Sequence, residues 1–430
     1  MSQPSQSEHN FSAMERQREI YVSGMSGKMP LLPLHPDALE AKAREVMSSE
    51  AFAYVAGGAG HEDTVSNNRQ DFHQWQIWPR MLRDVSQRDT SISLFGRRLP
   101  GPLLLSPVGV LDLAHKEADL AVAKACAAAG LPMIFSNQAS VTMEDCAAVM
   151  GSSPRWFQLY WSKSNDLVAS LVQRAEACGC EAIVVTLDTT MLGWRLRDLD
   201  LAYLPFLRGR GIAQYISDPV FQQQLLELGD APPPKAGKTN FKTLRNVYQL
   251  MSGYPGSTIS NLVSKQPLKA VRQFIDIYSR PSLTWADLPF LRQHTRLPIL
   301  LKGILHPDDA RQAVDAGVDG LIVSNHGGRQ VDGAVSAIQA LPGVIEAVGG
   351  QLPVLMDSGV RGGADMFKAL ALGAKAVCIG RPYVYALGIA GEAGVAELLR
   401  NLMADFELTM GLAGCKNIAE INRECLRSVS

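Results

Sequence analysis

Eight short apolar segments alternate with helix-like stretches from about residue 100 onward, and this alternation constrains the fold most strongly. The predicted strands are 102–106, 132–136, 155–160, 182–188, 298–302, 320–324, 353–357 and 375–379. The predicted helices include 117–129, 165–179, 307–316 and 364–372, and they are followed by Gly130, Gly179, Gly317 and Gly373, a residue common at helix ends. Apolar strands separated by helices are typical of a parallel sheet covered by helices. Eight such units predict an α/β fold, a closed (β/α)8 TIM barrel, with an open doubly wound sheet as the alternative.

Two regions do not follow the alternation. Residues 1–100 are expected to form an N-terminal helical extension, with a helix over about 37–56 and a short β segment near 92–100. Residues 196–285 interrupt the fourth and fifth units, and they contain a proline run at 232–234 and several aromatic residues. An insertion of this length usually has a function of its own, and we interpret it as a lid over the barrel mouth. The barrel is expected to occupy 101–430, interrupted by this insertion.

The charge and cysteine content exclude several classes of protein. The 430 residues carry 41 Lys and Arg against 42 Asp and Glu, so a formal charge of −1 predicts no nucleic-acid partner. Seven cysteines without a C-x-x-C pair predict neither a disulfide framework nor a metal centre. The sequence contains neither an apolar core typical of a signal peptide near its start nor a stretch suited to spanning a membrane. We therefore expect a cytoplasmic protein without a membrane partner.

Polar residues follow all eight predicted strands, where a TIM barrel carries its active site. They are Ser106, Ser136, Asn137, Gln138, Gln158, Tyr160, Thr186, Asp188, Lys302, Ser324, Asn325, His326, Asp357, Ser358, Gly380 and Arg381. Core packing alone would not require so many, so the sequence predicts one site lined by these loops. The glycines and arginines in 357–361 and 380–382 are typical of the phosphate site of such barrels. The alternative is that these glycines end helices and that Arg361 and Arg381 are surface charges.

His326 is the best candidate for a general base, because it lies on a glycine-rich loop and imidazole titrates near neutral pH. Arg329 is suited to bind an anionic substrate, and Asp188 to orient and stabilise an imidazolium. Lys302, at the end of the fifth predicted strand, is either a Schiff-base nucleophile or a fixed positive charge. The spacing of these residues does not choose between the two roles. The other seven histidines are interpreted as structural.

The run 324–330, Ser-Asn-His-Gly-Gly-Arg-Gln, resembles the signature of the FMN-dependent α-hydroxy acid oxidising enzymes. This family includes glycolate oxidase, lactate oxidase and lactate monooxygenase. The resemblance extends from about Tyr54 to Gly414. It is greatest to the lactate 2-monooxygenases, because the segments 54–60, 193–198 and 206–209 also read like theirs.

The resemblance implies a role for each candidate residue. His326 would be the base, with Asp188 as its charge partner, and Lys302 would hold the negative charge of the reduced flavin. The substrate carboxylate would be bound by Arg195 and Arg329, with the hydroxyls of Tyr54 and Tyr160. The remaining flavin contacts are implied for Pro107, Val108 and Gly109 near N5, for Ser136, Gln158, Thr186 and Ser324 at the ring and ribityl chain, and for Asp357, Gly359, Arg361, Gly380 and Arg381 at the ribityl chain and phosphate.

The implied reaction is the oxidation of a small L-2-hydroxy acid, with L-lactate favoured and oxygen as the acceptor. Gly109 stands where resembling oxidases more often have Ala, which favours monooxygenation, in which the product is decarboxylated to acetate, CO2 and water. Gln138 stands where several family members have an aromatic or apolar residue, which leaves room for a more polar acid. The alternatives are an oxidase that releases hydrogen peroxide, a quinone-linked dehydrogenase and a flavin-binding barrel without turnover. The resemblance also implies a homo-oligomer, a tetramer or an octamer.

Overall fold

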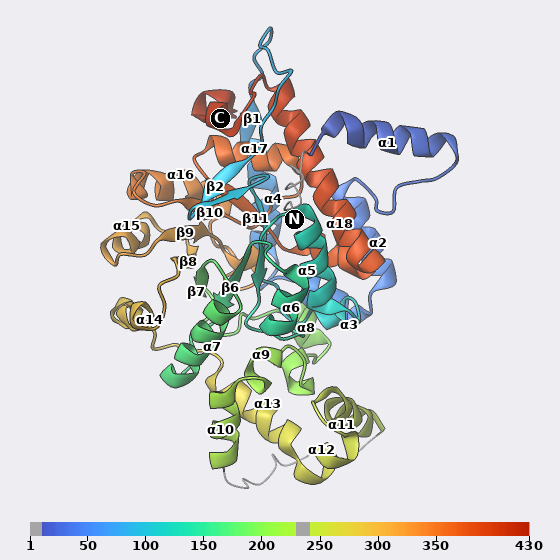
Figure 1. Ribbon diagram of the computed structural model, residues 1–430, viewed down its shortest axis with the longest axis vertical. Coiled ribbons are helices and arrows are strands. Elements are labelled where there is room, and N and C mark those ends of the chain that lie inside the picture. Colours follow the sequence, from blue (N-terminus) through green and yellow to red (C-terminus); the bar gives the residue numbers. More distant parts are fainter. Residues whose placement is uncertain (1–10, 229–240, 430) are drawn as a thin grey trace, which may run out of the picture.

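The computed structural model describes residues 11–228 and 241–429 and contains a closed barrel of eight parallel strands (Figure 1). In chain order the strands are β4 (Leu103–Leu105), β5 (Met133–Phe135), β6 (Arg155–Leu159), β7 (Ile183–Thr186), β8 (Ile299–Ile304), β9 (Gly320–Val323), β10 (Val354–Met356) and β11 (Ala376–Ile379). Each strand pairs with its neighbours in sequence, and the pairing of β11 with β4 closes the cylinder. The predicted TIM barrel is confirmed, and the open sheet is wrong.

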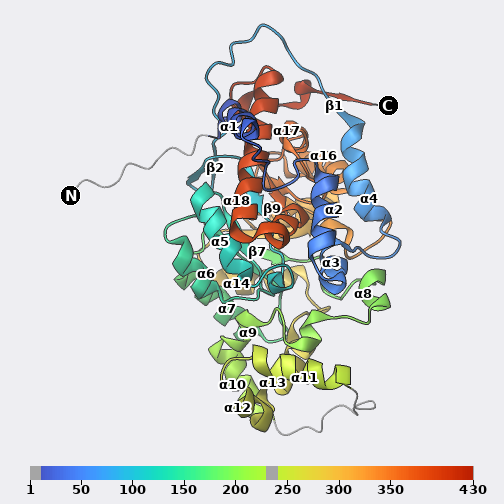
Figure 2. The same cartoon turned by 90° about the vertical axis from the view of Figure 1, so that its right-hand side faces the viewer.

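Helices surround the barrel on its outside (Figures 1 and 2). They are α5 (Ala118–Ala129), α6 (Met143–Met150), α7 (Asn165–Ala177), α14 (Leu288–His294), α15 (Pro307–Asp315), α16 (Ala337–Val348), α17 (Gly363–Ala371) and α18 (Arg381–Leu412). Local signals set their boundaries. The Ser164 hydroxyl accepts from the Leu167 amide at the start of α7, and Pro307 opens α15 behind the cap of His306. The four helices predicted by residue range are confirmed.

A β-hairpin packs against the interior of the barrel. It consists of β2 (Ile92–Leu94) and β3 (Arg97–Leu99), which confirms the β segment expected near 92–100. Leu94 and Leu99 join a buried cluster to which every barrel strand contributes: Leu104, Ile134, Trp156, Val184, Leu300, Ile322, Leu355, Ala376 and Cys378. This apolar cluster fills the barrel interior, so the polar site has to form at the other end of the strands.

The N-terminal extension contains more helices than the single one predicted. It comprises α1 (Ala13–Met25), α2 (Pro36–Val46), α3 (Ser49–Ala56), α4 (Asp63–Gln70) and η1 (Asp71–Gln74). The expected helix over 37–56 is wrong as one element, because the Ser48 hydroxyl accepts from the Ala51 amide and begins a new helix. Strand β1 (Trp75–Ile77) then pairs antiparallel with β12 (Leu426–Ser428), which joins this extension to the end of the chain.

The insertion after β7 forms a group of helices at one end of the molecule (Figures 1 and 2). They are α8 (Leu196–Asp200), η3 (Pro205–Arg208), α9 (Ala213–Ile216), α10 (Pro219–Glu227), α11 (Phe241–Gly253), α12 (Thr258–Ser264), α13 (Gln266–Ile277) and η4 (Trp285–Asp287). Phe206, Tyr215, Phe221 and Phe274 are buried and pack ring against ring, which gives the group an apolar core. The proline run at 232–234 lies outside the described residues.

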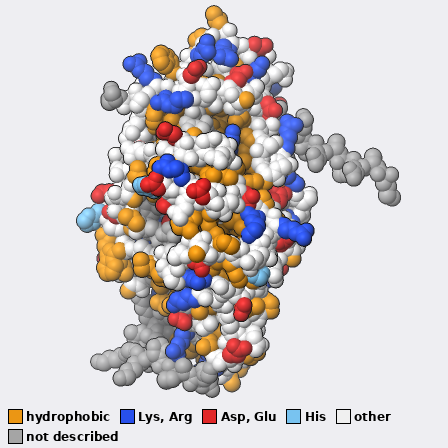
Figure 3. All heavy atoms as spheres, turned by 90° about the vertical axis from the view of Figure 1, so that its left-hand side faces the viewer, with side chains coloured by type: hydrophobic (Ala, Val, Ile, Leu, Met, Phe, Trp, Pro, Cys, Tyr) orange, Lys and Arg blue, Asp and Glu red, His pale blue; other side chains and the backbone are white. Residues whose placement is uncertain are grey.

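The surface carries mixed charge. On the face in Figure 3, basic and acidic side chains alternate, with hydrophobic side chains between them. Within residues 11–228 and 241–429, no helix has the length and apolar character that a membrane span requires.

The short helices η2 (Leu111–Leu113), η5 (His326–Gly328), η6 (Ile418–Glu420) and η7 (Arg423–Cys425) complete the fold.

Candidate active site

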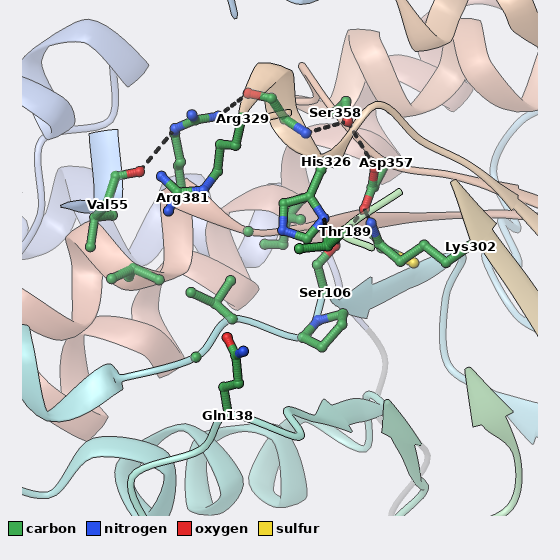
Figure 4. Close-up of a pocket in the computed structure, with 18 of the residues that line it drawn as sticks. Val55, Ser106, Gln138, Thr189, Lys302, His326, Arg329, Asp357, Ser358 and Arg381 are labelled. Atoms are coloured by element: carbon green, nitrogen blue, oxygen red, sulfur yellow. Dashed lines mark hydrogen bonds and ion pairs between the residues drawn. The ribbon is translucent and has the colours of Figure 1, made fainter. Parts of the chain in front are cut away.

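A pocket of about 1030 Å³, part of it open to solvent, lies among the loops that follow the barrel strands (Figure 4). Most of the predicted site residues line it: Tyr54, Pro107, Val108, Gly109, Tyr160, Arg195, Lys302, His326, Arg329, Asp357, Gly359, Arg361, Gly380 and Arg381. These residues come from the N-terminal extension and from seven of the barrel strands or the loops after them. The insertion also contributes Phe206 and Tyr278 to the lining.

Ser136, Gln158, Thr186 and Ser324 do not line this pocket. The Ser136 hydroxyl donates to Gln158 Oε1 over 3.2 Å, and Gln158 Nε2 donates to Thr186 Oγ1 over 3.0 Å. All four side chains are buried. Ser136, Gln158 and Thr186 orient one another, whereas Ser324 Oγ accepts from Lys302 Nζ and from the His326 amide.

His326 faces Asp188 with one ring nitrogen. Its Nδ1 lies 2.7 Å from Asp188 Oδ1 and 3.1 Å from Thr189 Oγ1, and the Thr189 hydroxyl donates to Asp188 Oδ1 over 2.8 Å. An Nδ1–H that donates to the carboxylate leaves Nε2 as the free lone pair. Burial lowers the pKa of His326 below its usual value, and Lys302 and Arg195 add to this against the opposing charge of Asp188. The resting imidazole is therefore neutral and able to accept a proton.

The loop that carries His326 is held in an unusual conformation. His326 has a φ of +56°, a left-handed value that side chains beyond glycine seldom adopt. Asn325 and Asn68 of α4 exchange amide hydrogen bonds of 2.7 and 2.8 Å, and the Gly327 amide donates to Ser358 Oγ over 2.9 Å. Such strain persists only where the surroundings enforce it, and it is common at functional sites.

Lys302 is a fixed cation. Its Nζ lies 2.7 Å from Ser324 Oγ, 3.2 Å from Asp357 Oδ2 and 3.7 Å from Asp188 Oδ2. Burial would lower the pKa of Lys302, but the two carboxylates outweigh it and the net pKa is raised. A Schiff-base nucleophile requires the neutral amine, so this geometry argues against that alternative. The same charges keep Asp188 ionised: burial acts to raise its pKa, but His326 and Lys302 lower it well below the usual value.

Arg195 and Arg329 bring two positive charges to the pocket without a carboxylate partner among the described residues. Arg195 Nε donates to the Arg329 carbonyl over 3.2 Å, and Arg329 Nη1 donates to the Gly57 carbonyl over 2.9 Å. Burial, followed by repulsion from Arg195, lowers the pKa of Arg329 to about 9. A bound anion would relieve this repulsion, so the pair is suited to a carboxylate.

Two tyrosines lie beside these arginines. The Arg329 guanidinium is 5.0 Å from the centre of the Tyr54 ring, and burial raises the pKa of Tyr54. Burial, with the charge of Asp188, also raises the pKa of Tyr160 to about 12. Both phenols stay protonated at neutral pH and can donate hydrogen bonds to an anion.

Arg361 and Arg381 form a second cationic region of the pocket, and its geometry is suited to a phosphate group. Neither forms an ion pair within the described residues, and Arg381 donates to the carbonyls of Val55 and Gly327 (Figure 4). Burial, then repulsion from Arg381, lowers the pKa of Arg361 to about 10. Gly359, at a φ of +98°, packs so closely against the Asn68 carbonyl that any side chain would collide with it. Two unpaired guanidinium groups beside such a glycine fit a phosphate.

The site and fold match known proteins over nearly the whole chain. The family model for FMN-dependent dehydrogenases matches residues 43–428. The chain belongs to this family. Its cofactor is FMN, and the unpaired arginine pair of the phosphate region fits that group.

Several relatives in the family have names that describe action on a hydroxy acid. The chain is 42% identical over 415 residues to an FMN-dependent alpha-hydroxy acid dehydrogenase of Penicillium citrinum. The matched residues cover 96% of each protein. It is 41% identical to an L-lactate oxidase of Lysinibacillus sphaericus, covering 93% of this chain and 94% of the relative. The crystal structure of a mandelate oxidase superposes with a TM-score of 0.73 at 37% identity, covering 92% and 98% of the two chains. This chain is therefore an enzyme that catalyses the FMN-dependent oxidation of 2-hydroxy acids.

The sequence analysis named Ser106 and Ser358 at the strand ends without assigning them a role, and it did not name Thr189, although all three line the pocket. Ser358 Oγ donates to Asp357 Oδ1 over 2.8 Å, and Ser106 lines the pocket wall beside it. Ser106 and Ser358 stood in the strand-end runs, and Thr189 directly follows Asp188, so position could have indicated all three. Tyr278 had no such signal, because it comes at the end of α13, far from any strand.

Proposed function

We propose that this chain oxidises a small L-2-hydroxy acid to the 2-oxo acid, with L-lactate as the favoured substrate and oxygen as the acceptor. The observation that carries the proposal is that one pocket holds an unpaired pair of arginines beside a histidine with a free Nε2. The bound FMN supplies the acceptor for two electrons. A protein that only stored flavin would need Arg361 and Arg381 for the phosphate, but neither the base His326 nor the pair of Arg195 and Arg329.

We assign each residue one task in this reaction. Arg195 and Arg329 bind the substrate carboxylate, with the hydroxyls of Tyr54 and Tyr160 as further donors. His326 Nε2 accepts the proton of the 2-hydroxyl, and Asp188 stabilises the imidazolium that forms. Lys302 holds a positive charge at the flavin, and Arg361 and Arg381 hold its phosphate. Pro107, Val108, Gly109, Ser136, Gln158, Thr186, Ser324, Asp357, Gly359 and Gly380 complete the flavin site.

We further propose that the product leaves slowly and is decarboxylated in the site. Hydrogen peroxide formed there converts a 2-oxo acid such as pyruvate to acetate, CO2 and water. Phe206 and Tyr278 of the insertion line the pocket, and the Phe206 and Tyr54 rings pack edge to face with centres 6.5 Å apart. This contact supports the interpretation of the insertion as a lid that retains the product. Gly109, which also lines the pocket, supports the same branch.

Anaerobic mixing of the yellow holoenzyme with L-lactate, glycolate and L-mandelate tests the first proposal. We expect L-lactate to bleach the flavin absorbance, and persistent yellow colour with every acid would disprove the function. Product analysis after admission of oxygen tests the second proposal. Acetate and CO2 without peroxide are expected. Stoichiometric pyruvate and peroxide would identify an oxidase, and reduction of quinone dyes with little oxygen uptake would identify a dehydrogenase.

We also propose a cytoplasmic homo-oligomer, a tetramer or octamer, in which 1–100 and 101–430 form the extension and the barrel. The resemblance to lactate 2-monooxygenases supports the assembly. Light scattering of the eluted holoenzyme measures its mass, and a monomer over the working concentration range would contradict this proposal.

A further inference from the structure

Gln138 is a polar side chain without a partner in the wall of the active-site pocket. It follows β5, lines the pocket and is only 8% exposed. Its backbone amide donates to Ser136 Oγ over 3.1 Å and its carbonyl accepts from the Val110 amide over 2.9 Å. The side-chain amide makes no hydrogen bond to any described residue. The amide lines the pocket, so a bound ligand can complete its hydrogen bonds without breaking one within the described residues.

The lid connects Gln138 to the carboxylate-binding end of the pocket. A Cβ atom built on Gly211 would lie 3.0 Å from both the Gln138 carbonyl oxygen and Phe206 Cε1. The backbone of Gly211 therefore lies close to both groups. Phe206 packs in turn on Tyr54, whose ring lies under the Arg329 guanidinium. In Figure 4, the Gln138 amide points from below toward the loop after β4. These contacts place the backbone of Gln138 beside the lid, and Gln138 lines the same pocket as Tyr54 and Arg329.

The charge of the pocket restricts what the amide can bind. The cations that line it are Arg195, Arg329, Arg361, Arg381 and Lys302. Lys302 lies between Asp188 and Asp357, Arg361 and Arg381 are proposed to hold the flavin phosphate, and the charge of Asp198 already acts on Arg195 and Arg329. One substrate carboxylate at Arg195 and Arg329 therefore leaves no further cation in the lining. A second carboxylate would therefore be buried without a cation, which is costly.

We propose that Gln138 selects a 2-hydroxy acid whose side chain is neutral and hydrogen-bonding, namely one with a hydroxyl on C3. This inference rests on the proposed function and names the substrate class more closely. The C3 hydroxyl donates to Gln138 Oε1 or accepts from Nε2, and L-glycerate is the smallest such acid. L-Lactate fits the same space but leaves the amide unpaired. A site built to hydrogen-bond a hydroxyl discriminates strongly against the analogue that lacks it.

The test compares L-glycerate with L-lactate in the holoenzyme and in the Gln138→Leu variant. We expect kcat/KM for L-glycerate to exceed that for L-lactate by about tenfold or more in the wild type, and we expect this ratio to fall by about tenfold or more in the variant. Because the replaced amide makes no hydrogen bond to any residue that the structure describes, the variant should unfold at the same temperature or higher. Gln312→Leu on the exposed face of α15 is the matched control and should leave the ratio unchanged.

Binding measured without turnover gives an independent readout. By calorimetry, 3-hydroxypropanoate should bind the wild-type holoenzyme more tightly than propanoate, and the difference should vanish in Gln138→Leu. A glycerate-to-lactate ratio that stays within about twofold in the variant would overturn the inference. L-Malate as the best substrate would overturn the charge argument. If no 2-hydroxy acid bleaches the flavin, the proposed function fails, whereas bleaching with an unchanged ratio removes only the role of Gln138.

Discussion

His326 Nδ1 lies 2.7 Å from Asp188 Oδ1, although 138 residues separate the two in the chain. The Thr189 hydroxyl donates to the same carboxylate oxygen and lies 3.1 Å from Nδ1. This arrangement fixes the orientation of the imidazole and leaves Nε2 free for the substrate. The first three predictions follow from it.

The His326→Gln variant should bind FMN but lose its reduction by substrate. The amide of Gln cannot accept the hydroxyl proton, so the reduction rate should fall by about 10²- to 10⁴-fold. Stopped-flow absorbance of the anaerobic holoenzyme measures this rate, and the flavin content of the purified variant is the control. A normal reduction rate would remove His326 from the role of base.

The Asp188→Asn variant should also reduce slowly, because the carboxylate charge that stabilises the imidazolium is lost. We expect a decrease of about 10²- to 10³-fold, in the range found for general acid–base catalysis. Thr189→Val is the matched control, since it removes the hydroxyl bonded to Asp188 but keeps the charge. That control should lose less than about tenfold, because one neutral hydrogen bond contributes about 1 kcal/mol. Equal losses in both variants would contradict a role for the charge.

The pH profile should reflect the lowered pKa of His326. Catalysis needs the neutral imidazole, so kcat/KM falls as the pH decreases through the pKa of the folded free enzyme. Burial lowers that pKa, and the acidic limb should therefore lie below the value of about 6.5 of an ordinary histidine. Steady-state values of kcat/KM measured from about pH 4 to about pH 9 define this limb, because the range extends beyond the pH values at which histidine ordinarily titrates. An acidic limb well above the ordinary value would show that another group titrates.

Replacing Arg329 should affect substrate binding more than folding. The buried guanidinium has no carboxylate partner and is repelled by Arg195 and Arg381, so Arg329→Met should unfold at a temperature close to that of the wild type. Substrate binding should weaken by about 2–5 kcal/mol, because the carboxylate loses a buried charge partner. Arg329→Lys keeps the charge without the planar fork and should be intermediate. An unchanged dissociation constant for oxalate, which is not oxidised, would argue against the carboxylate role.

Gly109→Ala should disturb the segment that carries Gln138. An added Cβ would lie 2.8 Å from the Gln138 carbonyl oxygen and 3.0 Å from Gln138 Cβ, so the backbone of one segment has to move. We expect a loss of about 1–3 kcal/mol in the free energy of unfolding, and a shift of products from acetate toward peroxide. Gly24→Ala in α1, where a Cβ meets nothing within 4 Å, is the control. A stable variant with an unchanged product ratio would contradict both expectations.

The barrel and most of its site residues could be predicted from the sequence. Each strand is a short apolar run, and the carboxyl ends of parallel strands converge, so polar residues at 106, 188, 302, 326 and 357 had to meet at one end. The extension was predicted less well. Helix α4, which holds Asn68 against Asn325, is polar except for Val65 and shows no apolar periodicity. Ser48 divided the predicted helix because capping competes locally with continuation.

The sequence by itself determined the order of strands and helices and the chemical groups at the strand ends, because both depend on patterns within a few neighbouring residues. Only the tertiary structure decided that Nδ1 of His326 faces Asp188, that Lys302 lies between two carboxylates, and that four arginines of the pocket form no ion pair with residues 11–228 and 241–429. It also decided that the amide of Gln138 lines the pocket without a hydrogen bond to these residues. These properties depend on distances between segments far apart in the chain, and side-chain packing and burial set such distances rather than local preference.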